Sequence, residues 1–331
     1  MLEIVNQMHS IEELRNIFLA YLQTENKIIE PKNLYEPNHY FLQIGGKRLR
    51  PILLLLATDI FDGEIEQSLA ASLAIEYFHN FTLIHDDVMD KAPLRRGFTT
   101  IHEKYNLNTA ILSGDVLMIK ACEYLAKVNE KYFKTVFDVY TKTAIEVCEG
   151  QQYDIDFETK EVVTHDEYIE MIRLKTSVLL AASMKIGAIL GGAKKEDTEL
   201  LYQYAENLGI AFQIQDDILD CYGDEKLVGK QPGGDIIQNK KTLLLIHAIE
   251  KSNANNDTQL NEILKQSVFN NDEKVNDILA IFNTYNTKAF GIEKRDMYIQ
   301  KSIDALEKIN LNSEKKAVLN SLIDYLVMRD F

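Results

Sequence analysis

Proline and glycine are scarce in this chain. Only 5 of its 331 residues are Pro and 15 are Gly, whereas hydrophobic residues make up 46%. An all-β fold needs frequent turn residues, so this composition disfavours one and favours long helices. The hydrophobic content is enough for a large core, and no obvious linker interrupts the sequence. We therefore predict an all-α protein with a single domain over residues 1–331.

Cysteines and basic residues are also few. Cys122, Cys148 and Cys221 are widely spaced, which excludes the paired spacing of a zinc site or a disulfide framework and fits a reducing compartment. Asp and Glu number 51 against 36 Lys and Arg, a formal net charge of −15. Such an acidic chain argues against nucleic acid as the main partner. We predict a cytoplasmic protein that holds any anionic ligand through local basic clusters.

Long apolar runs are missing as well. The first residues lack a basic segment followed by an apolar run, so no signal peptide is predicted. The most apolar stretch, residues 177–193, is too short to span a bilayer and contains Lys185. We expect a buried helix there and no membrane span.

Apolar residues at three- to four-residue spacing predict helices along most of the chain. Neither a strand-like alternation of useful length nor a solenoid repeat is present in the sequence. The predicted helices are residues 11–22, 52–61, 68–89, 110–128, 132–152, 177–190, 200–222, 242–250, 259–268, 274–282, 289–309 and 313–328.

One acidic pattern, Asp-Asp-x-x-Asp, occurs twice. Its first and third carboxylates are four residues apart, so on a helix both leave the same face. Like charges so close repel each other unless cations neutralise them, and hard oxygen ligands with room for water and phosphate favour Mg²⁺. A single set could be a solvated helix face, but two sets after apolar segments indicate two facing helices that hold metal ions over one substrate. The sets are Asp86, Asp87 and Asp90, and Asp216, Asp217 and Asp220.

Basic residues accompany glycines at three places. Lys47 and Arg50, three apart, are predicted to share a helical face just after a glycine pair. This cluster could equally be a solvated helix end, and the glycine-rich segment after residue 228 an ordinary surface loop. Beside two acidic sets, however, the clusters imply a diphosphate substrate bridged by Mg²⁺. The three clusters contain Gly46, Lys47 and Arg50; Arg95 and Arg96; and Lys230 and Lys240.

Taken in order, these motifs resemble those of the trans-type (E) polyprenyl diphosphate synthases. The resemblance runs from about residue 40 to 245, and residues 324–330 resemble the family's C-terminal tail. It implies an isoprenoid-synthase helical bundle around a central cavity, a prenyltransferase activity and a homodimer. Other segments that carry the resemblance are residues 114–117, 150–154, 175–176 and 212–220.

The resemblance also implies a mechanism. In that family, an allylic diphosphate sits between the two acidic helices with three Mg²⁺ ions, its C–O bond ionises, and isopentenyl diphosphate attacks the allylic cation. By resemblance, Asp86, Asp90 and Asp216 would bind metal directly, supported by Asp87, Asp217, Asp220 and Asp235; Arg95, Lys175 and Lys230 would hold the allylic diphosphate; Gly46, Lys47, Arg50, His79 and Arg96 would hold isopentenyl diphosphate; Thr176, Gln213 and Lys240 would lie along the path of the cation or at the leaving group.

In the family, bulky residues upstream of the first acidic set limit product length. Phe81 stands five residues before Asp86 and Thr82 four, with Tyr77 and Phe78 deeper. This resembles a geranylgeranyl pattern more than the double-aromatic farnesyl one, although helix geometry turns Thr82 and Phe78 closer to the acidic face than Phe81. The aromatics could also simply pack the core. We expect geranylgeranyl diphosphate as product, with farnesyl and then longer-chain diphosphates as alternatives.

Two other functions are considered. A class I terpene cyclase would carry Asn/Asp-x-x-Ser/Thr-x-x-x-Glu as its second metal motif, and the set at residues 216–220 speaks against it. A non-catalytic regulatory subunit of a prenyltransferase would have eroded acids, whereas every acid and lysine is present here.

Overall fold

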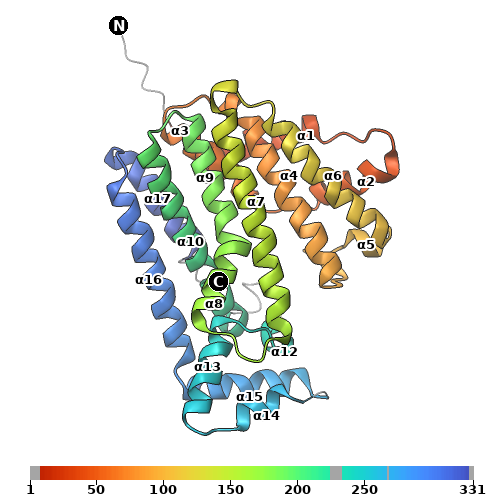
Figure 1. Cartoon of the computed structure of the whole chain (residues 1–331), viewed down its shortest axis with the longest axis vertical. Coiled ribbons are helices and arrows are strands. Elements are labelled where there is room, and N and C mark those ends of the chain that lie inside the picture. The colour runs from red at the N-terminus through yellow and green to blue at the C-terminus, as the bar shows by residue number, and fades with distance from the viewer. Residues whose placement is uncertain (1–7, 224–232, 267, 328–331) are drawn as a thin grey trace. The chain divides into compact units, whose positions relative to one another are not determined.

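The computed structural model describes residues 8–223, 233–266 and 268–327, and these are almost entirely helical (Figure 1). The all-α prediction is confirmed. Two-residue strands β1 (Leu94–Arg95) and β2 (Phe98–Thr99) form one antiparallel pair between α4 and α5. The helices are α1 (Ile11–Glu25), α2 (Lys32–Gln43), α3 (Leu49–Ile60), α4 (Ile65–Met89), α5 (Ile101–Lys104), α6 (Leu107–Leu125), α7 (Glu130–Thr159), α8 (His165–Ile172), the π-helical turn η1 (Arg173–Ser177), α9 (Val178–Leu190), α10 (Lys195–Tyr222), α12 (Gly234–Ile237), α13 (Leu243–Ala254), α14 (Gln259–Leu264), α15 (Asn271–Thr284), α16 (Thr287–Lys308) and α17 (Ser313–Leu326).

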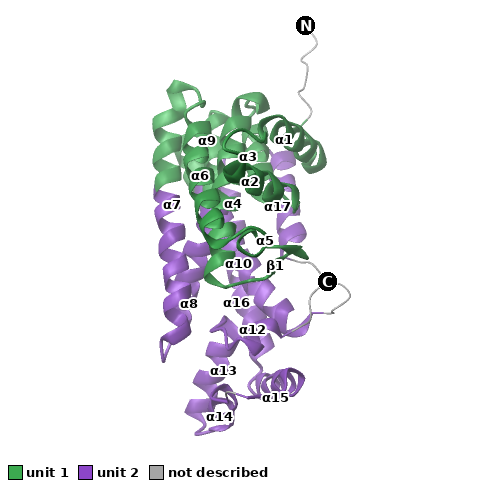
Figure 2. Ribbon diagram, turned by 90° about the vertical axis from the view of Figure 1, so that its right-hand side faces the viewer, with its two compact units in different colours: residues 1–141, 182–199 green, residues 142–181, 200–331 purple. Residues whose placement is uncertain are grey.

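The chain divides into two compact units (Figure 2). Unit 1 comprises residues 1–141 and 182–199, and unit 2 comprises residues 142–181 and 200–331. The division falls within α7, α9 and α10 rather than in a loop. The single domain over residues 1–331 stays a prediction.

In unit 1, α4 packs along α6 and against α3 (Figure 1). Residues 71–78 of α4 are all buried, although Ser72 and Glu76 among them are polar, so this part of α4 is covered on every side. The C-terminal part of α9 belongs to this unit, and Gly187 brings it against α3. A Cβ at Gly187 would overlap the carbonyl group of Leu54, so the absence of a side chain permits this close helix contact.

In unit 2, one apolar cluster joins α8, α10, α13 and α15. His247 of α13 stacks on Phe290 of α16 with ring centroids 3.8 Å apart and nearly parallel planes. Tyr204 of α10 is fully buried and donates a hydrogen bond to the carbonyl of Leu319 in α17. These contacts hold the second acidic helix, α10, in a closely packed core.

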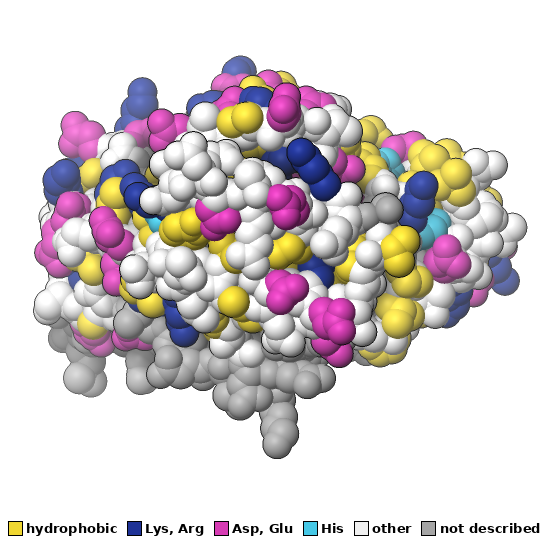
Figure 3. Space-filling view, turned by 90° about the horizontal axis from the view of Figure 1, so that it is seen from below, with side chains coloured by type: hydrophobic (Ala, Val, Ile, Leu, Met, Phe, Trp, Pro, Cys, Tyr) yellow, Lys and Arg dark blue, Asp and Glu magenta, His cyan; other side chains and the backbone are white. Residues whose placement is uncertain are grey.

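The predicted helices are all present, although their ends differ by a few residues. Four further helices, α2, α5, α8 and α12, and the π-helical turn η1 were not predicted. In the part of the chain that the structure describes, no helix is long and apolar enough to cross a membrane. On the face shown in Figure 3, acidic and basic side chains are scattered among uncharged ones.

Candidate active site

The first acidic set ends α4. Asp87 is 2% exposed, whereas Asp86 is half-buried and Asp90 is exposed. The backbone N–H of Asp90 donates to the Asp86 carbonyl at 2.9 Å, so the helical spacing of the first and third acids is kept through the helix end. The set therefore presents its outer acids toward the surface and its middle acid toward the interior.

Arg95 holds the buried acid of this set. Its Nε donates to both carboxylate oxygens of Asp87 at 2.8 and 2.9 Å, and its Nη2 lies 3.4 Å from Asp86 Oδ2. The short β1–β2 pair carries Arg95 back to the end of α4. Burial raises the pKa of Asp87, and the Arg95 guanidinium opposes that rise. Arg95 thus lies beside the acids, as the sequence predicts, whereas its neighbour Arg96 donates to the loop before α3.

The second acidic set repeats this arrangement in α10. Asp216 is exposed, Asp217 is 4% exposed and Asp220 is half-buried. Tyr168 of α8 donates its hydroxyl hydrogen to Asp217, and burial raises the pKa of Asp217 to about 7 despite that bond. Asp220 accepts a hydrogen bond from the backbone N–H of Asp235 at 3.0 Å, which ties the start of α12 to the set.

The donor chemistry of both sets fits Mg²⁺. Among the residues that the structure describes, no group of three or more His, Cys, Asp or Glu side chains is arranged to hold a metal ion. Magnesium, however, is commonly bound through one or two carboxylates together with water and substrate phosphate oxygens. Asp86, Asp90 and Asp216 offer surface-facing carboxylates of that kind.

The loop before α3 differs from the prediction. Helix α3 begins at Leu49, after Arg48 at a left-handed φ of 50°, and Gly45 and Gly46 have φ of 86° and 132°. The prediction that Lys47 and Arg50 share a helical face is therefore wrong, because three left-handed residues turn the chain before the helix starts. Lys47 is exposed in the loop.

The loop of Gly45 and Gly46 contacts Arg96, and the half-buried His79 lies beside Arg50. Arg96 donates to the carbonyl of Gly45, and a Cβ at Gly46 would overlap its guanidinium, so only glycine leaves it this space. Arg50 Nη1 lies 3.2 Å from His79 Nε2. Burial and the neighbouring arginines hold the pKa of His79 well below its ordinary value. Gly46, Arg50, His79 and Arg96 are thus brought together within unit 1.

Lys175 and Thr176 lie in the π-helical turn η1 between α8 and α9. There the N–H of Val178 donates to the carbonyl five residues earlier, a local widening that is frequent at functional sites. Lys175 Nζ lies 2.5 Å from Asp154 of α7, and Thr176 Oγ1 donates to Gln213 Oε1 at 3.4 Å. Gln213 in turn donates to Asp217 at 3.5 Å.

Gly150 makes this turn possible. A Cβ there would overlap the backbone nitrogen of Lys175, so α7 can approach η1 only at a glycine.

The predicted lysines after the second acidic set are Lys230 and Lys240. Lys240 Nζ lies 4.0 Å from Asp235 Oδ1. Lys230 lies outside the described residues.

The four residues predicted to limit chain length separate into two groups. Phe78 contacts Phe81 and Tyr140 of α7, with ring centroids 5.5 Å apart in both pairs. Thr82 donates to the carbonyl of His79 at 2.8 Å. Tyr77 instead contacts Tyr124 of α6 edge to face. Its role in chain length stays a prediction, but it does not share the Phe81 cluster.

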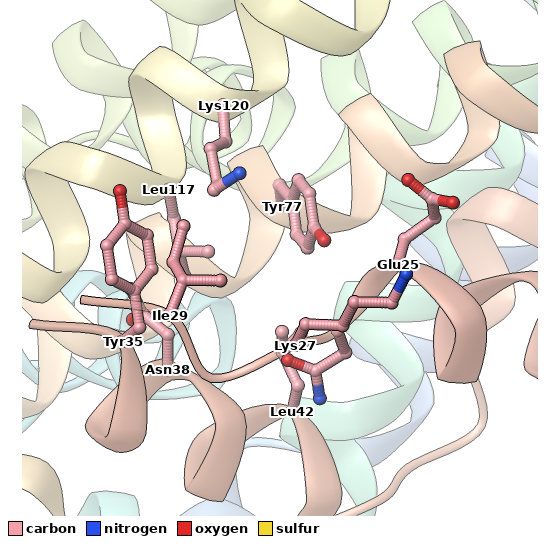
Figure 4. A pocket seen from close by; sticks show the side chains of 10 residues that line it. Glu25, Lys27, Ile29, Tyr35, Asn38, Leu42, Tyr77, Leu117 and Lys120 are labelled. Carbon is pink, nitrogen blue, oxygen red and sulfur yellow. The ribbon is translucent and has the colours of Figure 1, made fainter. Parts of the chain in front are cut away.

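Tyr77 faces a small cavity in unit 1 (Figure 4). The cavity has a volume of about 150 Å³, and Figure 4 shows Tyr77 between Lys120 of α6 and Lys27 of the segment before α2. Tyr77 is thus part of a separate environment from the aromatic cluster of α4 and α7. The lining residues are Glu25, Asn26, Lys27, Ile29, Tyr35, Asn38, Leu42, Tyr77, Leu117 and Lys120.

Three residues of these environments escape the sequence analysis. Tyr168 is the hydroxyl partner of Asp217, Asp154 is the ion partner of Lys175, and Tyr140 packs against Phe78. Asp154 lies within one of the resembling motifs and could have been found there. Tyr168 and Tyr140 follow no motif, since their partners lie far away in the sequence.

Comparison with known proteins decides the family. The polyprenyl synthetase model matches residues 31–282. The chain belongs to the polyprenyl synthetase family. Members transfer prenyl groups, so the protein is a prenyltransferase with the all-α isoprenoid-synthase fold.

Relatives and solved structures of this family agree along most of the chain. A geranylgeranyl diphosphate synthase of Methanosarcina mazei is 46% identical over 226 residues, 68% of this chain and 70% of that protein. A geranylgeranyl pyrophosphate synthase of Geoglobus acetivorans is 37% identical over 304 residues, 91% of this chain and 92% of that protein. A crystal structure of a geranylgeranyl pyrophosphate synthase has a TM-score of 0.93 and 40% identity, and the match covers 98% of this chain and 100% of that one. The family assignment favours a synthase over a terpene cyclase.

Proposed function

We propose that this prenyltransferase condenses isopentenyl diphosphate with an allylic diphosphate to form all-trans geranylgeranyl diphosphate. The observation that carries the proposal is the arrangement common to both acidic sets. In each, the middle acid is buried and hydrogen-bonded, to Arg95 or to Tyr168, which fixes the outer carboxylates at the surface of the helix. Carboxylates fixed in this way are pre-organised ligands for a metal-bound diphosphate.

We propose Mg²⁺, three ions per active site, as the cofactor. When bound, the ions supply the positive charge that stabilises a departing diphosphate. Asp86, Asp90 and Asp216 would bind them directly, while Asp87, Asp217 and Asp220 would hold the outer acids and their helices in place. Asp235 ties α12 to the second set through its N–H.

The chain's own cations would hold the two substrates. Lys47, Arg50 and Arg96 bind the diphosphate of isopentenyl diphosphate, and Gly46 leaves space for Arg96 to approach. His79, kept neutral by its burial and its arginine neighbours, can both donate and accept a hydrogen bond there.

A second group acts on the allylic substrate and on the cation. Arg95 and Lys230 bind the allylic diphosphate. Lys175 binds it too and, with Lys240, places positive charge at the leaving group. Thr176 and Gln213, joined by a hydrogen bond, direct oxygen dipoles toward the developing cation.

Product length is proposed from the aromatic cluster on α4. Phe81 and Phe78, backed by Tyr140, form a buried wall one to two turns before Asp86. Such a wall would stop a growing chain at geranylgeranyl length. Farnesyl and longer-chain diphosphates are the alternatives that the assay below distinguishes.

We also propose a homodimer in the cytoplasm. Four large apolar residues, spaced so as to form a stripe along α6, are exposed in the single chain, and such a stripe is a surface for burial against a second copy. The three cysteines are free thiols, which fits a reducing compartment. The stripe consists of Leu107, Ile111, Leu112 and Ile119.

The test is an incubation of the purified protein with labelled isopentenyl diphosphate and, separately, dimethylallyl, geranyl and farnesyl diphosphates. Chain lengths are read by chromatography after dephosphorylation, with and without EDTA. Metal-dependent elongation that stops at twenty carbons supports the proposal, and a stop at fifteen keeps the mechanism and overturns the product. No incorporation with any starter would leave the non-catalytic subunit as the better description.

A further inference from the structure

A buried ion pair lies behind the loop that carries Gly46 and Lys47. Arg48 is 8% exposed and Glu76 of α4 is 2% exposed, and the guanidinium donates to the Glu76 carboxylate. Burying two charges is unfavourable unless they pair and their remaining hydrogen-bonding groups are satisfied. Neither residue belongs to the predicted substrate or metal ligands.

The pair joins three helices. Arg48 Nη2 donates to the carbonyl of Leu42 in the last turn of α2, where carbonyls lack helical partners. Asn80, four residues after Glu76, donates to the same Glu76 oxygen at 2.8 Å and to the Glu76 carbonyl at 2.7 Å. Arg48 thus links the end of α2, the start of α3 and the middle of α4.

The backbone of the loop depends on this link. Arg48 has a left-handed φ of 50°, which is unfavourable for a residue with a side chain and persists only where surrounding contacts hold it. Its position in the sequence lies directly between Lys47 and the first turn of α3, which carries Arg50. The contacts that hold Arg48 therefore set the direction of the Lys47 and Arg50 side chains on either side of it.

Glu76 also acts on the cations themselves. It is the carboxylate whose charge opposes the lowering of the pKa of both Arg50 and Arg96. Its second oxygen, Oε2, is buried and has no hydrogen-bond partner among the described residues. Glu76 and His79 are three residues apart, so they lie on one face of α4 toward the same arginines.

We infer that Arg48 and Glu76 are positioning residues that hold the loop of residues 45–48 in the conformation that binds the isopentenyl diphosphate headgroup. They act through Lys47, Arg50 and Arg96 and do not touch the substrate. This inference rests on the proposed function, because it takes the isopentenyl diphosphate site from it.

The test separates substrate affinity from turnover. In Glu76→Gln the side chain keeps its size and loses its charge, and in Arg48→Lys the charge remains but one ammonium cannot reach both Glu76 and Leu42. For both variants we expect the KM for isopentenyl diphosphate to rise about tenfold to a hundredfold. The kcat at saturation and the KM for the allylic substrate should change less than about threefold.

A matched control removes a different buried polar contact from α4. Ser68 is buried and its hydroxyl lies 2.9 Å from that of Thr58, far along the helix from residue 76. Ser68→Ala should lower the thermal midpoint without changing either KM. If Glu76→Gln, folded by circular dichroism, shows the same isopentenyl KM as Ser68→Ala, the inference is wrong.

A double variant separates positioning from stability. Replacing a buried ion pair by apolar residues often restores stability, so Arg48→Met with Glu76→Leu should regain most of the thermal midpoint. The isopentenyl KM should nevertheless stay high, because the loop has lost its link to Leu42. A return of this KM to the wild-type value would overturn the inference.

Direct binding distinguishes a failure of the inference from a failure of the proposed function. Isopentenyl diphosphate is titrated calorimetrically into wild type and Glu76→Gln in EDTA, where no turnover occurs. Weaker binding to the variant supports the inference even if the wild type makes no product. Equal binding, together with normal wild-type turnover, refutes the inference alone.

Discussion

Phe81 and Tyr77 lie one turn apart on α4 and face different neighbours. Phe81 contacts Phe78, which is backed by Tyr140, while Tyr77 contacts Tyr124 beside the cavity of Figure 4. The sequence places both residues upstream of the acids and cannot tell them apart, because the side that each faces depends on which helix packs there.

Their substitutions should therefore differ. We expect Phe81→Ala to shift the product from twenty to twenty-five carbons or more, since the wall nearest Asp86 is removed. Tyr77→Ala should leave the product length unchanged, contrary to the role that the sequence predicts for it, while lowering stability by about 3–5 kcal/mol, as for other buried aromatics. Chromatography of dephosphorylated products and thermal unfolding measure the two effects. Lengthening by Tyr77→Ala, or none by Phe81→Ala, would contradict this division.

His247 is a residue whose protonation should control stability. Burial, and then the nearby His165 and lysines, lower its pKa to about 4, and it stacks on Phe290. The unfolded chain binds this proton more readily than the folded one at every pH between about 4 and about 6.5. The stabilisation that neutral His247 gives to the folded protein is therefore complete above pH 6.5 and is lost as the pH falls toward 4.

We expect proton binding to His247 in the unfolded chain to lower the free energy of unfolding by about 1–2 kcal/mol at pH 5 relative to pH 7. His247→Phe keeps an aromatic ring against Phe290 and removes the titration, so its stability should fall less on acidification. Urea unfolding at pH 5 and 7 for both proteins gives the comparison. An identical pH dependence in the two would show that His247 is not responsible.

At the level of elements, the apolar spacing locates most helices, because a helix that buries one face has apolar residues at every third or fourth position. Helix α2 escapes because it contains Pro37 and many polar residues. Helix α8 begins with a capping box formed by Thr164 and Glu167, a local signal that could have identified it. The β1–β2 pair is too short for any alternation to appear, yet it carries Arg95 to the acids.

The close approach of α7 and η1 gives a prediction about elements. Gly150→Ala places a Cβ where the backbone of Lys175 lies, so one of the two helices must move. We expect a loss of about 1–3 kcal/mol in stability and at least a tenfold loss of kcat, because Lys175 and Thr176 move together. Stopped assays and thermal unfolding measure both quantities.

The control for that substitution is its exposed neighbour Glu149, changed to Ala on the same helix. It should leave activity and stability nearly unchanged, because alanine favours a helix and the Glu149 side chain is exposed. If Gly150→Ala behaved like this control, the contact between α7 and η1 would not constrain the site.

At the level of the whole molecule, self-association is the feature to test. Ile119 of α6 is 62% exposed, the most exposed residue of the apolar stripe proposed as the dimer surface. Ile119→Glu should weaken association at least tenfold, since a carboxylate would have to be buried unpaired. Sedimentation velocity across a dilution series reports the mass.

Val162, equally exposed in the segment between α7 and α8, supplies the control. Val162→Glu should sediment like the wild type. The homodimer is refuted if the wild type is already a monomer, and the α6 surface is refuted if both variants remain dimers.

The candidate site was predictable in its chemistry and not in its geometry. The acids and cations appear in the sequence with their spacing, so Asp86, Asp216 and Arg95 could be chosen from it. That Asp87 and Asp217 are buried, and that Arg48 turns the chain before α3, follows only from packing between distant segments. Hydrogen-bond partners such as Tyr168 have no sequence pattern of their own.

The π-helical turn η1 has one further consequence. It contains one residue more than a regular turn and absorbs that residue locally, so the apolar repeat of α9 is displaced from that of α8 by one position in the sequence. Deleting a single residue between 173 and 177 would restore one uninterrupted α-helix while each flanking helix kept its own packing face. The fold and the turn that holds Lys175 are therefore separable, and a protein with this deletion could keep the architecture while losing the chemistry.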